Sequence, residues 1–313
     1  MNRSAPRSVN QYLKALRAEL AGEDSALIQD ALYDAEEYLR AEVAAHADKS
    51  ESDVLELIAS TYGAPDEVAS AYRDTEAKVK AAMSNPRKVP GSGIGAFFSV
   101  FLDPRAYTSL FFMLLSLATG VIYFTFAVTG LSLSAGLAVL VVGIPFFLAF
   151  MALTRVVSLA EGRLIEAMTG ERMPRRPVHQ GTATGFWSRM GQMLKDRRTW
   201  TTLAYLILML PLGIGYFVMA VVGLSISLAF IFAPLLDFAG RFGWFGWFEP
   251  AHMSPAWLDS LWVSPLMVLA GVLLLTLLMH LARGVGRLHA MYAKALLVAP
   301  AAPLTGNTQT GSQ

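Results

Sequence analysis

The chain has 313 residues, of which 54% are hydrophobic and 16% are charged, and its mean hydropathy is +0.46. Soluble proteins usually carry about a quarter charged residues, so this composition argues against an all-soluble chain. The absence of cysteine excludes disulfides, thiolate metal sites and a cysteine nucleophile. The five histidines lie far apart and match no metal-ligand spacing, so the sequence predicts neither a metal nor a cofactor.

The net charge of +1 conceals two oppositely charged parts. Residues 1–83 hold sixteen Asp/Glu against nine Lys/Arg, whereas residues 84–313 hold eight against sixteen. The sequence therefore predicts an acidic domain joined to a basic, apolar one. Because DNA binding needs clustered basic residues, we expect no direct contact between the acidic domain and nucleic acid.

Residues 1–84 are predicted to form a small helical domain. Apolar positions repeat with a helical period over 9–20, 25–45 and 50–63, and Pro65 favours the start of a fourth helix. The first forty residues lack the apolar core and the cleavage site of a signal peptide, so we expect a cytoplasmic N-terminus.

This acidic domain resembles the HAAS module, a short helical unit found beside PadR-type regulators in bacterial membrane signalling proteins. The resemblance rests on three strings: Asp34-Ala-Glu-Glu-Tyr-Leu39, Lys49-Ser-Glu-Ser-Asp-Val54 and Tyr62-Gly-Ala-Pro-Asp-Glu-Val-Ala69. The family's Leu-Gly-Asp-Pro motif is replaced here by Tyr-Gly-Ala-Pro, which keeps only the Gly and the Pro. The resemblance implies a docking module for a cytoplasmic protein, a PadR-type transcriptional regulator, although a purely structural cap is the alternative. The candidate docking residues are Glu36, Glu37, Tyr38, Asp66 and Glu67.

The rest of the chain reads as a membrane domain. A Pro/Gly/Ser-rich linker at 85–93 precedes an apolar domain at 94–298, and a polar tail at 299–313 is predicted to be disordered. A helix needs about 20 apolar residues to cross a bilayer. Uncharged runs of 49, 38 and 23 residues therefore allow four spans, which we place at about 107–129, 132–154, 200–222 and 262–282.

Basic residues between the spans predict the orientation. The segment 155–198 carries nine Lys/Arg against four Asp/Glu, and the C-terminal segment carries Arg283, Arg287 and Lys294 with no acid. By the positive-inside rule both segments face the cytoplasm of a bacterium, which requires an even number of spans in its inner membrane. We therefore expect 223–236 to form a short, partly inserted helix. A fifth span at 223–239 is the alternative, and it would reverse the C-terminus.

An internal repeat with an offset of 93 residues aligns 103–134 with 196–227. Fifteen of the 32 aligned positions are identical, including Asp-x-Arg, Tyr-Phe and Gly-Leu-Ser-x-Ser in register. We expect two duplicated helical hairpins, at about 103–168 and 196–291, each turning at Gly-Leu-Ser. Each should begin with a capping Asp, an Arg at the headgroup level and an interfacial aromatic residue. These residues are Asp103, Arg105 and Tyr107 in the first repeat, and Asp196, Arg198 and Trp200 in the second.

The second repeat carries an insertion at about 236–261 that is rich in aromatic residues. Under the four-span prediction it lies outside the cell. Its composition fits an aromatic belt at the membrane interface, and a sensing or ligand-binding loop is the alternative. The candidate sensing residues are Trp244, Trp247, Glu249, His252, Trp257 and Asp259.

The repeat resembles the membrane sensor domain of bacterial histidine kinases and related regulators. The resemblance rests on Asp196-Arg-Arg-Thr-Trp-Thr-Thr-Leu-Ala-Tyr205, Leu210-Pro-Leu-Gly213 and Ala233-Pro-Leu235, but no kinase or nucleotide motif follows. It implies a sensor that couples an envelope or membrane stimulus to a cytoplasmic partner. A transporter or channel subunit built on the repeat is the alternative. Among ionisable residues the predicted spans contain only His280, so we expect no catalytic site.

Two basic segments, 172–176 and 189–198, lie beside apolar residues such as Trp187. This pattern is typical of a helix that lies on anionic lipid. The segments also fit a docking surface for the acidic N-terminal domain, because opposite charges on one cytoplasmic face attract. The sequence leaves open whether the chain forms a homo-oligomer.

Overall fold

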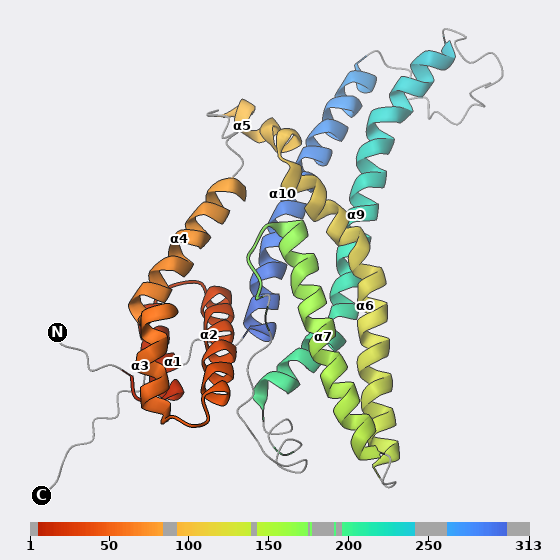
Figure 1. The fold of residues 1–313 in the computed structure, drawn as a ribbon. Coiled ribbons are helices and arrows are strands. Elements are labelled where there is room, and N and C mark those ends of the chain that lie inside the picture. Colours follow the sequence, from red (N-terminus) through yellow and green to blue (C-terminus); the bar gives the residue numbers. More distant parts are fainter. Residues whose placement is uncertain are drawn as a thin grey trace, which may run out of the picture.

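The computed structural model describes residues 6–83, 93–138, 143–174, 176, 191, 196–241 and 262–298. Every regular element in this part of the chain is a helix. Figure 1 shows a small helical domain lying beside a set of long helices. Four of these helices are long and apolar enough to cross a membrane. The protein is thus an all-α polytopic membrane protein, as its composition and uncharged runs predict.

The N-terminal domain consists of the four helices expected from the apolar periodicity. These are α1 (Val9–Glu19), α2 (Ser25–Ala45), α3 (Glu51–Thr61) and α4 (Pro65–Met83). Side-chain oxygens of Ser8, Asp24 and Ser50 cap the first three helices by accepting a backbone N–H near the helix start. Gly22 and Gly63 adopt positive φ angles in the breaks between helices, a conformation that glycine reaches without steric cost.

One hydrophobic core joins these four helices. Fully buried side chains from α1, α2 and α3 meet in it, and α4 adds Val68 and Ala69. The Tyr12 hydroxyl donates to the carbonyl of Gly63 at 2.8 Å, which fixes the turn before α4 against α1. The core explains why short helices that would be marginal alone are stable together.

The membrane domain begins with two short elements, α5 (Ile94–Phe98) and η1 (Ser99–Leu102). Four long helices follow: α6 (Pro104–Leu137), α7 (Gly143–Thr169), α9 (Arg197–Arg241) and α10 (Val263–Leu297). α6 and α9 contain the predicted spans 107–129 and 200–222, and α10 contains all but the first residue of 262–282. The predicted span 132–154 begins too early, because residues 132–137 still belong to α6 and α7 starts at Gly143. The helices are longer than these spans, because the charged residues that end the apolar runs are themselves helical.

Two predictions about where the long helices turn or break are also wrong. The Gly-Leu-Ser sequences do not turn the chain, because α6 runs through Gly130 and α9 runs through Gly223. The expected separate helix at 223–236 is likewise part of α9. The physical reason is local: Ser134 and Ser227 donate their hydroxyls to the carbonyls of Gly130 and Gly223, at 2.6 and 2.7 Å, so these serines are satisfied inside a continuous helix.

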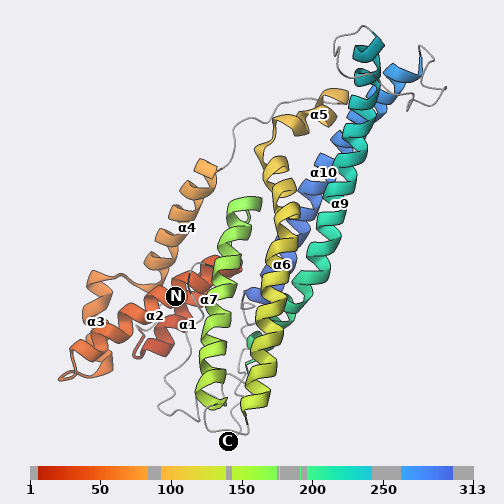
Figure 2. The same ribbon diagram turned by 90° about the vertical axis from the view of Figure 1, so that its right-hand side faces the viewer.

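The four long helices pack as two hairpins that point in opposite directions (Figures 1 and 2). The end of α6 and the start of α7 lie at one end of the molecule, whereas the end of α9 and the start of α10 lie at the other. Glycine allows α6 and α9 to approach closely. A Cβ atom built on Gly213 would lie 2.1 Å from the carbonyl oxygen of Ser116, and one on Gly120 would lie 2.6 Å from that of Met209.

α6 and α9 pack against each other in opposite directions, because Gly120 of α6 meets Met209 and Gly213 of α9 meets Ser116. The start of α6 and the start of α9 therefore lie toward opposite ends of the molecule (Figures 1 and 2).

Candidate functional site

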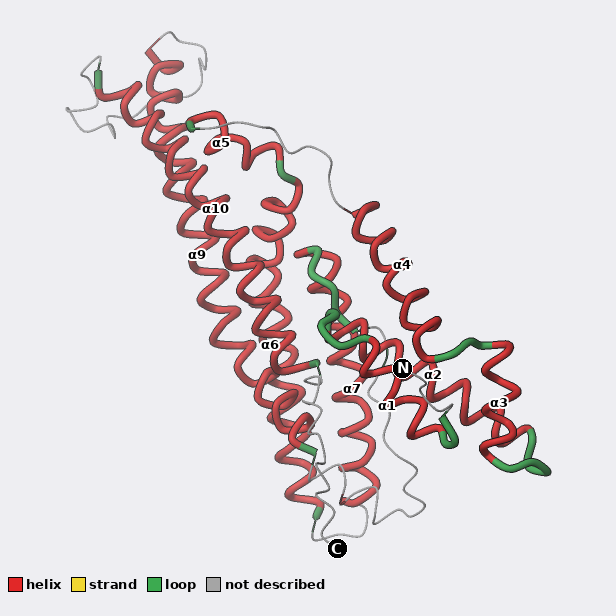
Figure 3. The backbone as a smooth tube through the Cα atoms, turned by 90° about the vertical axis from the view of Figure 1, so that its left-hand side faces the viewer, coloured by secondary structure: helices red, strands yellow, loops and turns green. Residues whose placement is uncertain are grey.

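The N-terminal domain contacts the membrane domain through α2 and α4. Figure 3 shows the loop that follows α7 passing close to this domain. Contacts to α2 come from this loop, from the start of α9 and from the end of α10. Three segments that are distant in the sequence therefore meet one acidic face.

Arg172 is the most enclosed cation of this interface. Its guanidinium pairs with Asp30, at 3.2 Å between Nη2 and Oδ2, and also with Glu76 of α4. Asp30 and Glu76 are only 5% and 6% exposed. Removing one partner of a buried ion pair leaves an uncompensated charge and costs about 3–5 kcal/mol. Arg172 therefore holds α2 and α4 together against the membrane domain.

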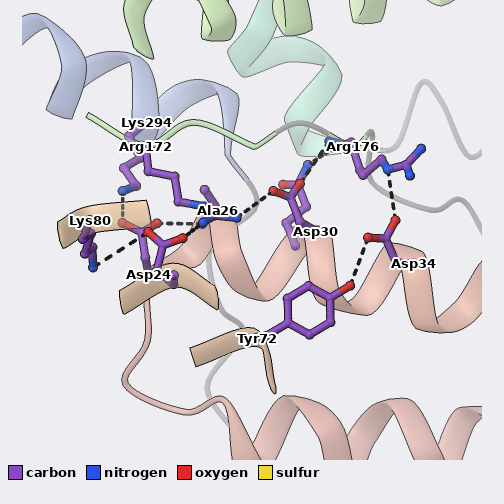
Figure 4. A network of polar contacts seen from close by, with 11 residues as sticks. Asp24, Ala26, Asp30, Asp34, Tyr72, Lys80, Arg172, Arg176 and Lys294 are labelled. Carbon is purple, nitrogen blue, oxygen red and sulfur yellow. Dashed lines mark hydrogen bonds and ion pairs between the residues drawn. The ribbon is translucent and has the colours of Figure 1, made fainter. Parts of the chain in front are cut away.

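Arg176 uses its backbone as well as its side chain (Figure 4). Its N–H donates to Asp30 Oδ1 at 3.0 Å, and its carbonyl accepts from Gln29 Nε2 at 2.6 Å. The guanidinium Nε lies 3.0 Å from Asp34 Oδ1, and the guanidinium carbon lies 5.6 Å from the centre of the Tyr33 ring. These contacts fix the main chain of the loop to α2.

α9 and α10 complete the interface at their ends. Arg198 donates from Nη1 to Gln29 Oε1 at 3.2 Å, and from Nη2 to the carbonyl of Leu297. Lys294 forms an ion pair with Asp24, the residue that caps α2. The predicted docking of the acidic domain on basic residues is present, with Arg172, Arg176 and Arg198 as its contacts.

The docking residues predicted from the HAAS resemblance lie elsewhere in the domain. Glu36 pairs with Arg40 on α2, and Tyr38 stacks on Tyr62 with 4.5 Å between ring centres. Glu67 accepts the N–H of Ala64 and so caps α4, while Glu37 and Asp66 are exposed. The contacts to the membrane domain described above are made by other residues of α2 and α4. Their binding to a cytoplasmic protein stays a prediction.

The residues that start the two repeats make equivalent local contacts. Asp103 and Asp196 each accept the N–H of the arginine two residues later, at 3.0 Å, and so cap α6 and α9. Thr108 and Thr201 each donate to a carbonyl near the end of a neighbouring helix, that of Met168 at 2.7 Å and that of Leu296 at 2.9 Å.

The arginines and aromatic residues of the two starts differ in their surroundings. Arg105 lies against Gly170, whereas Arg198 enters the domain interface. Tyr107 and Trp200 are both 50% exposed. Their place at the membrane interface stays a prediction. The six candidate sensing residues, Trp244, Trp247, Glu249, His252, Trp257 and Asp259, lie outside the residues that the structure describes.

A buried polar cluster joins all four long helices, and the sequence analysis missed it. Glu161 of α7, which is fully buried, accepts the hydroxyl of Tyr123 of α6 at 2.7 Å and that of Tyr205 of α9 at 2.8 Å. The Tyr205 hydroxyl also lies 3.0 Å from Nε2 of His289 on α10. Nδ1 of His289 lies 3.5 Å from the hydroxyl of Tyr216.

One assignment of protons satisfies this cluster. Both tyrosines donate to the Glu161 carboxylate, the Nε2–H of His289 donates to Tyr205, and Tyr216 donates to Nδ1. The cluster therefore acts as a polar tie between helices. Among the described residues no group of three His, Asp or Glu could hold a metal ion.

The sequence did not predict this cluster, because two of its members lie outside the apolar spans of about 23 residues. Glu161 and His289 lie beyond the predicted span ends, yet still within α7 and α10. One available signal was Tyr123, which the repeat aligns with Tyr216.

The cluster and the domain interface share two helices. Tyr205 follows Arg198 by seven residues on α9, about two helical turns, and Lys294 follows His289 by five residues on α10. The hydrogen bonds of Arg198 to Leu297 and of Thr201 to Leu296 tie the two helix ends to each other. A shift of α9 against α10 at the cluster would therefore move the residues that hold the N-terminal domain.

Comparison with known families assigns the membrane domain. Residues 112–297 match the family described as "Putative sensor", and the chain belongs to this sensor family. The matched region contains the buried cluster and all four cations of the interface, whereas the N-terminal domain lies outside it. No curated protein and no solved structure matches the chain.

Proposed function

We propose that this protein is a non-enzymatic membrane sensor whose membrane domain controls the docking of its N-terminal domain. A stimulus in the membrane or envelope shifts the four-helix domain between two arrangements. The N-terminal domain is held in one and released in the other, which hides or exposes it to a cytoplasmic protein. The observation that supports this proposal is the set of ion pairs that join α2 and α4 to Arg172, Arg176 and Lys294.

The physical basis is a difference in contacts between two states. A stimulus can shift the equilibrium between the two states only by the difference between its free energies of interaction with them. The interface is suited to this role because it depends on charges from three separate segments. A small change in the spacing of these segments breaks several ion pairs together.

The proposed location is the inner membrane of a bacterium, with a cytoplasmic N-terminus. The basic segments after α7 and at the end of α10 support this side. The resemblance of the N-terminal domain to the HAAS module supports a PadR-type regulator as the partner. The equivalent caps and threonine contacts of α6 and α9 support a duplicated hairpin as the origin of the membrane domain.

Distance measurement between spin labels tests the docking. Because the chain has no cysteine, Lys78→Cys on α4 and Arg287→Cys on α10 give two unique attachment sites at exposed positions. We expect one narrow distance distribution for the labelled full-length protein in nanodiscs. Arg172→Glu with Arg176→Glu should broaden it, because each reversed charge then faces a carboxylate.

A matched control carries the same change in net charge. Lys14→Glu with Lys49→Glu alters two exposed residues of the N-terminal domain away from the interface, and we expect the distribution to stay narrow. If the Arg172 and Arg176 reversals also leave the distribution unchanged, the proposed docking is wrong.

A second candidate function is transport, and the antiparallel packing of α6 and α9 is the observation that favours it. Repeats of opposite direction are typical of secondary transporters. Flux of small solutes into proteoliposomes separates the two functions. We expect no flux above that of protein-free liposomes; saturable uptake would favour the transporter.

A further inference from the structure

A groove of about 750 Å³ lies where α6 begins and α7 ends, and its lining residues belong to neither the domain interface nor the buried cluster. Its lining includes two arginines, one acid and an apolar wall. These residues are Pro104, Arg105, Arg163, Glu166, Met168 and Gly170.

The walls of the groove are held in place by two contacts. Thr108 donates to the carbonyl of Met168 at 2.7 Å, which joins α6 to the end of α7. Arg105 packs across Gly170, whose positive φ of 74° turns the chain out of α7. A residue with a side chain at position 170 would be strained in this conformation, and its Cβ would lie in van der Waals contact with the Arg105 guanidinium, 3.4 Å from the central carbon. The groove is therefore a built feature of the fold.

The chemistry of the groove favours an anionic ligand. Two guanidinium groups against one carboxylate leave a net charge of +1, and arginine binds phosphate oxygens through paired N–H groups. The positive charge of the groove comes from these two side chains and not from the start of α6, because Asp103 caps that helix end and pairs with Arg283 at 3.3 Å.

The surroundings of the groove favour a lipid over a soluble anion. Leu102 directly precedes the groove and is 66% exposed, and Phe111 of α6 is 55% exposed. A basic site at the start of an apolar helix, with exposed apolar side chains beside it, matches a phospholipid whose phosphate meets the arginines and whose acyl chains follow the helix.

We propose that this groove binds the phosphodiester headgroup of an anionic phospholipid, with Arg105 and Arg163 as the phosphate ligands. Glu166 disfavours a second negative charge and so limits the site to one phosphodiester. The site also bears on the proposed function, because Gly170 in its wall is two residues from Arg172 at the domain interface. Lipid binding itself does not require that function.

Native mass spectrometry of the detergent-solubilised full-length protein tests the proposal. The protein is mixed in turn with phosphatidylglycerol, phosphatidylethanolamine and phosphatidylcholine, and the bound fraction of each is measured. We expect phosphatidylglycerol to be retained most strongly. Arg163→Gln, a change at an exposed residue that leaves the fold intact, should weaken its retention about fivefold, the loss expected for one cation near a lipid headgroup.

Two further variants sharpen the test. Arg287→Gln removes an exposed arginine from α10 outside the groove and should retain phosphatidylglycerol as the wild type does. Glu166→Gln removes the acid of the groove and should increase retention of phosphatidylglycerol.

Equal retention of the three lipids, or equal losses in Arg163→Gln and Arg287→Gln, would overturn the proposal. Displacement of the lipid by 10-fold excess inorganic phosphate would show that the site binds a free anion instead. A failure of these lipid measurements would leave the label distances of the docking experiment unaffected, so the two proposals fail separately.

Discussion

Glu161 shows how a single residue can tie a membrane domain together. Its carboxylate is buried among four helices and is stabilised by two tyrosine hydroxyls, one from α6 and one from α9. A buried carboxylate without such donors would be costly in an apolar bundle. Uncharged runs in the sequence could not reveal this residue, because it lies seven residues beyond the end of the first run.

Removing the central hydroxyl of the cluster should destabilise the bundle. Tyr205→Phe takes one donor from Glu161 and leaves Nε2 of His289 without its partner. We expect a loss of about 1–3 kcal/mol in the free energy of unfolding, the cost of unsatisfied buried polar groups. Thermal unfolding in detergent, followed by circular dichroism, measures it. Tyr107→Phe removes a hydroxyl from a half-exposed site and should change stability by less than about 0.5 kcal/mol.

The Tyr72 hydroxyl should make the folding stability of the N-terminal domain sensitive to alkaline pH. Its hydroxyl donates to Asp34 at 3.0 Å, and burial, followed by the charge of Asp34, raises the pKa of Tyr72 above its usual value. Because the pKa of Tyr72 is higher in the folded than in the unfolded state, its hydroxyl stabilises the folded domain fully below the unfolded pKa of about 10. This contribution is lost as the pH rises further.

The measurement for Tyr72 is the urea midpoint of the full-length protein at pH 8 and pH 11. We expect a lower midpoint at pH 11 for the wild type and a smaller decrease for Tyr72→Phe, which has no proton to lose there. An equal decrease in both proteins would contradict a role for this residue.

At the scale of helices, periodicity and capping residues predicted the N-terminal domain well. Each predicted helix is present, and Pro65 is the first residue of α4, as expected. The long helices were predicted to exist but not to extend so far. A Gly-Leu-Ser sequence resembles a turn only until the serine hydroxyls are paired within the helix, and that pairing is not visible in a residue pattern.

Because α6 packs closely on α9, alanine substitutions at two nearby glycines of α9 should differ sharply in their effect on stability. Gly213→Ala places a methyl group against the Ser116 carbonyl, so we expect a loss of about 1–3 kcal/mol in stability. Gly215→Ala adds the same group to the same helix in open space, where it should be neutral or stabilising by up to about 1 kcal/mol. Thermal unfolding of the two variants compares them directly. Equal effects would contradict the close approach of α6 and α9.

At the scale of the whole molecule, charge asymmetry predicted the contact between the two parts but not the residues that make it. The acidic face that docks contains Asp24, Asp30 and Asp34, whereas the motif resemblance had indicated other residues of α2 and α4. Motifs reflect local sequence, and the docking face depends on where α7, α9 and α10 end in space. The direction of the hairpins was also beyond the sequence, because it depends on backbone contacts of Gly120 and Gly213.

The proposed orientation is tested by reporter fusions. We expect a fusion after Gly246 to report from outside the cell, and fusions after Gly181 and Ala301 to report from inside, as the distribution of basic residues requires. A fusion after Ala301 that reports from outside would show an odd number of spans.

In the proposed function, the arrangement of the membrane helices controls the docking of the N-terminal domain. The most direct test repeats the label distance between positions 78 and 287 in Glu161→Gln, a variant that weakens the buried cluster without touching the interface. We predict a second, longer distance population, because loosened α9 and α10 shift Arg198 and Lys294 away from α2. A distribution identical to that of the wild type, in a variant whose stability has measurably fallen, would contradict the account.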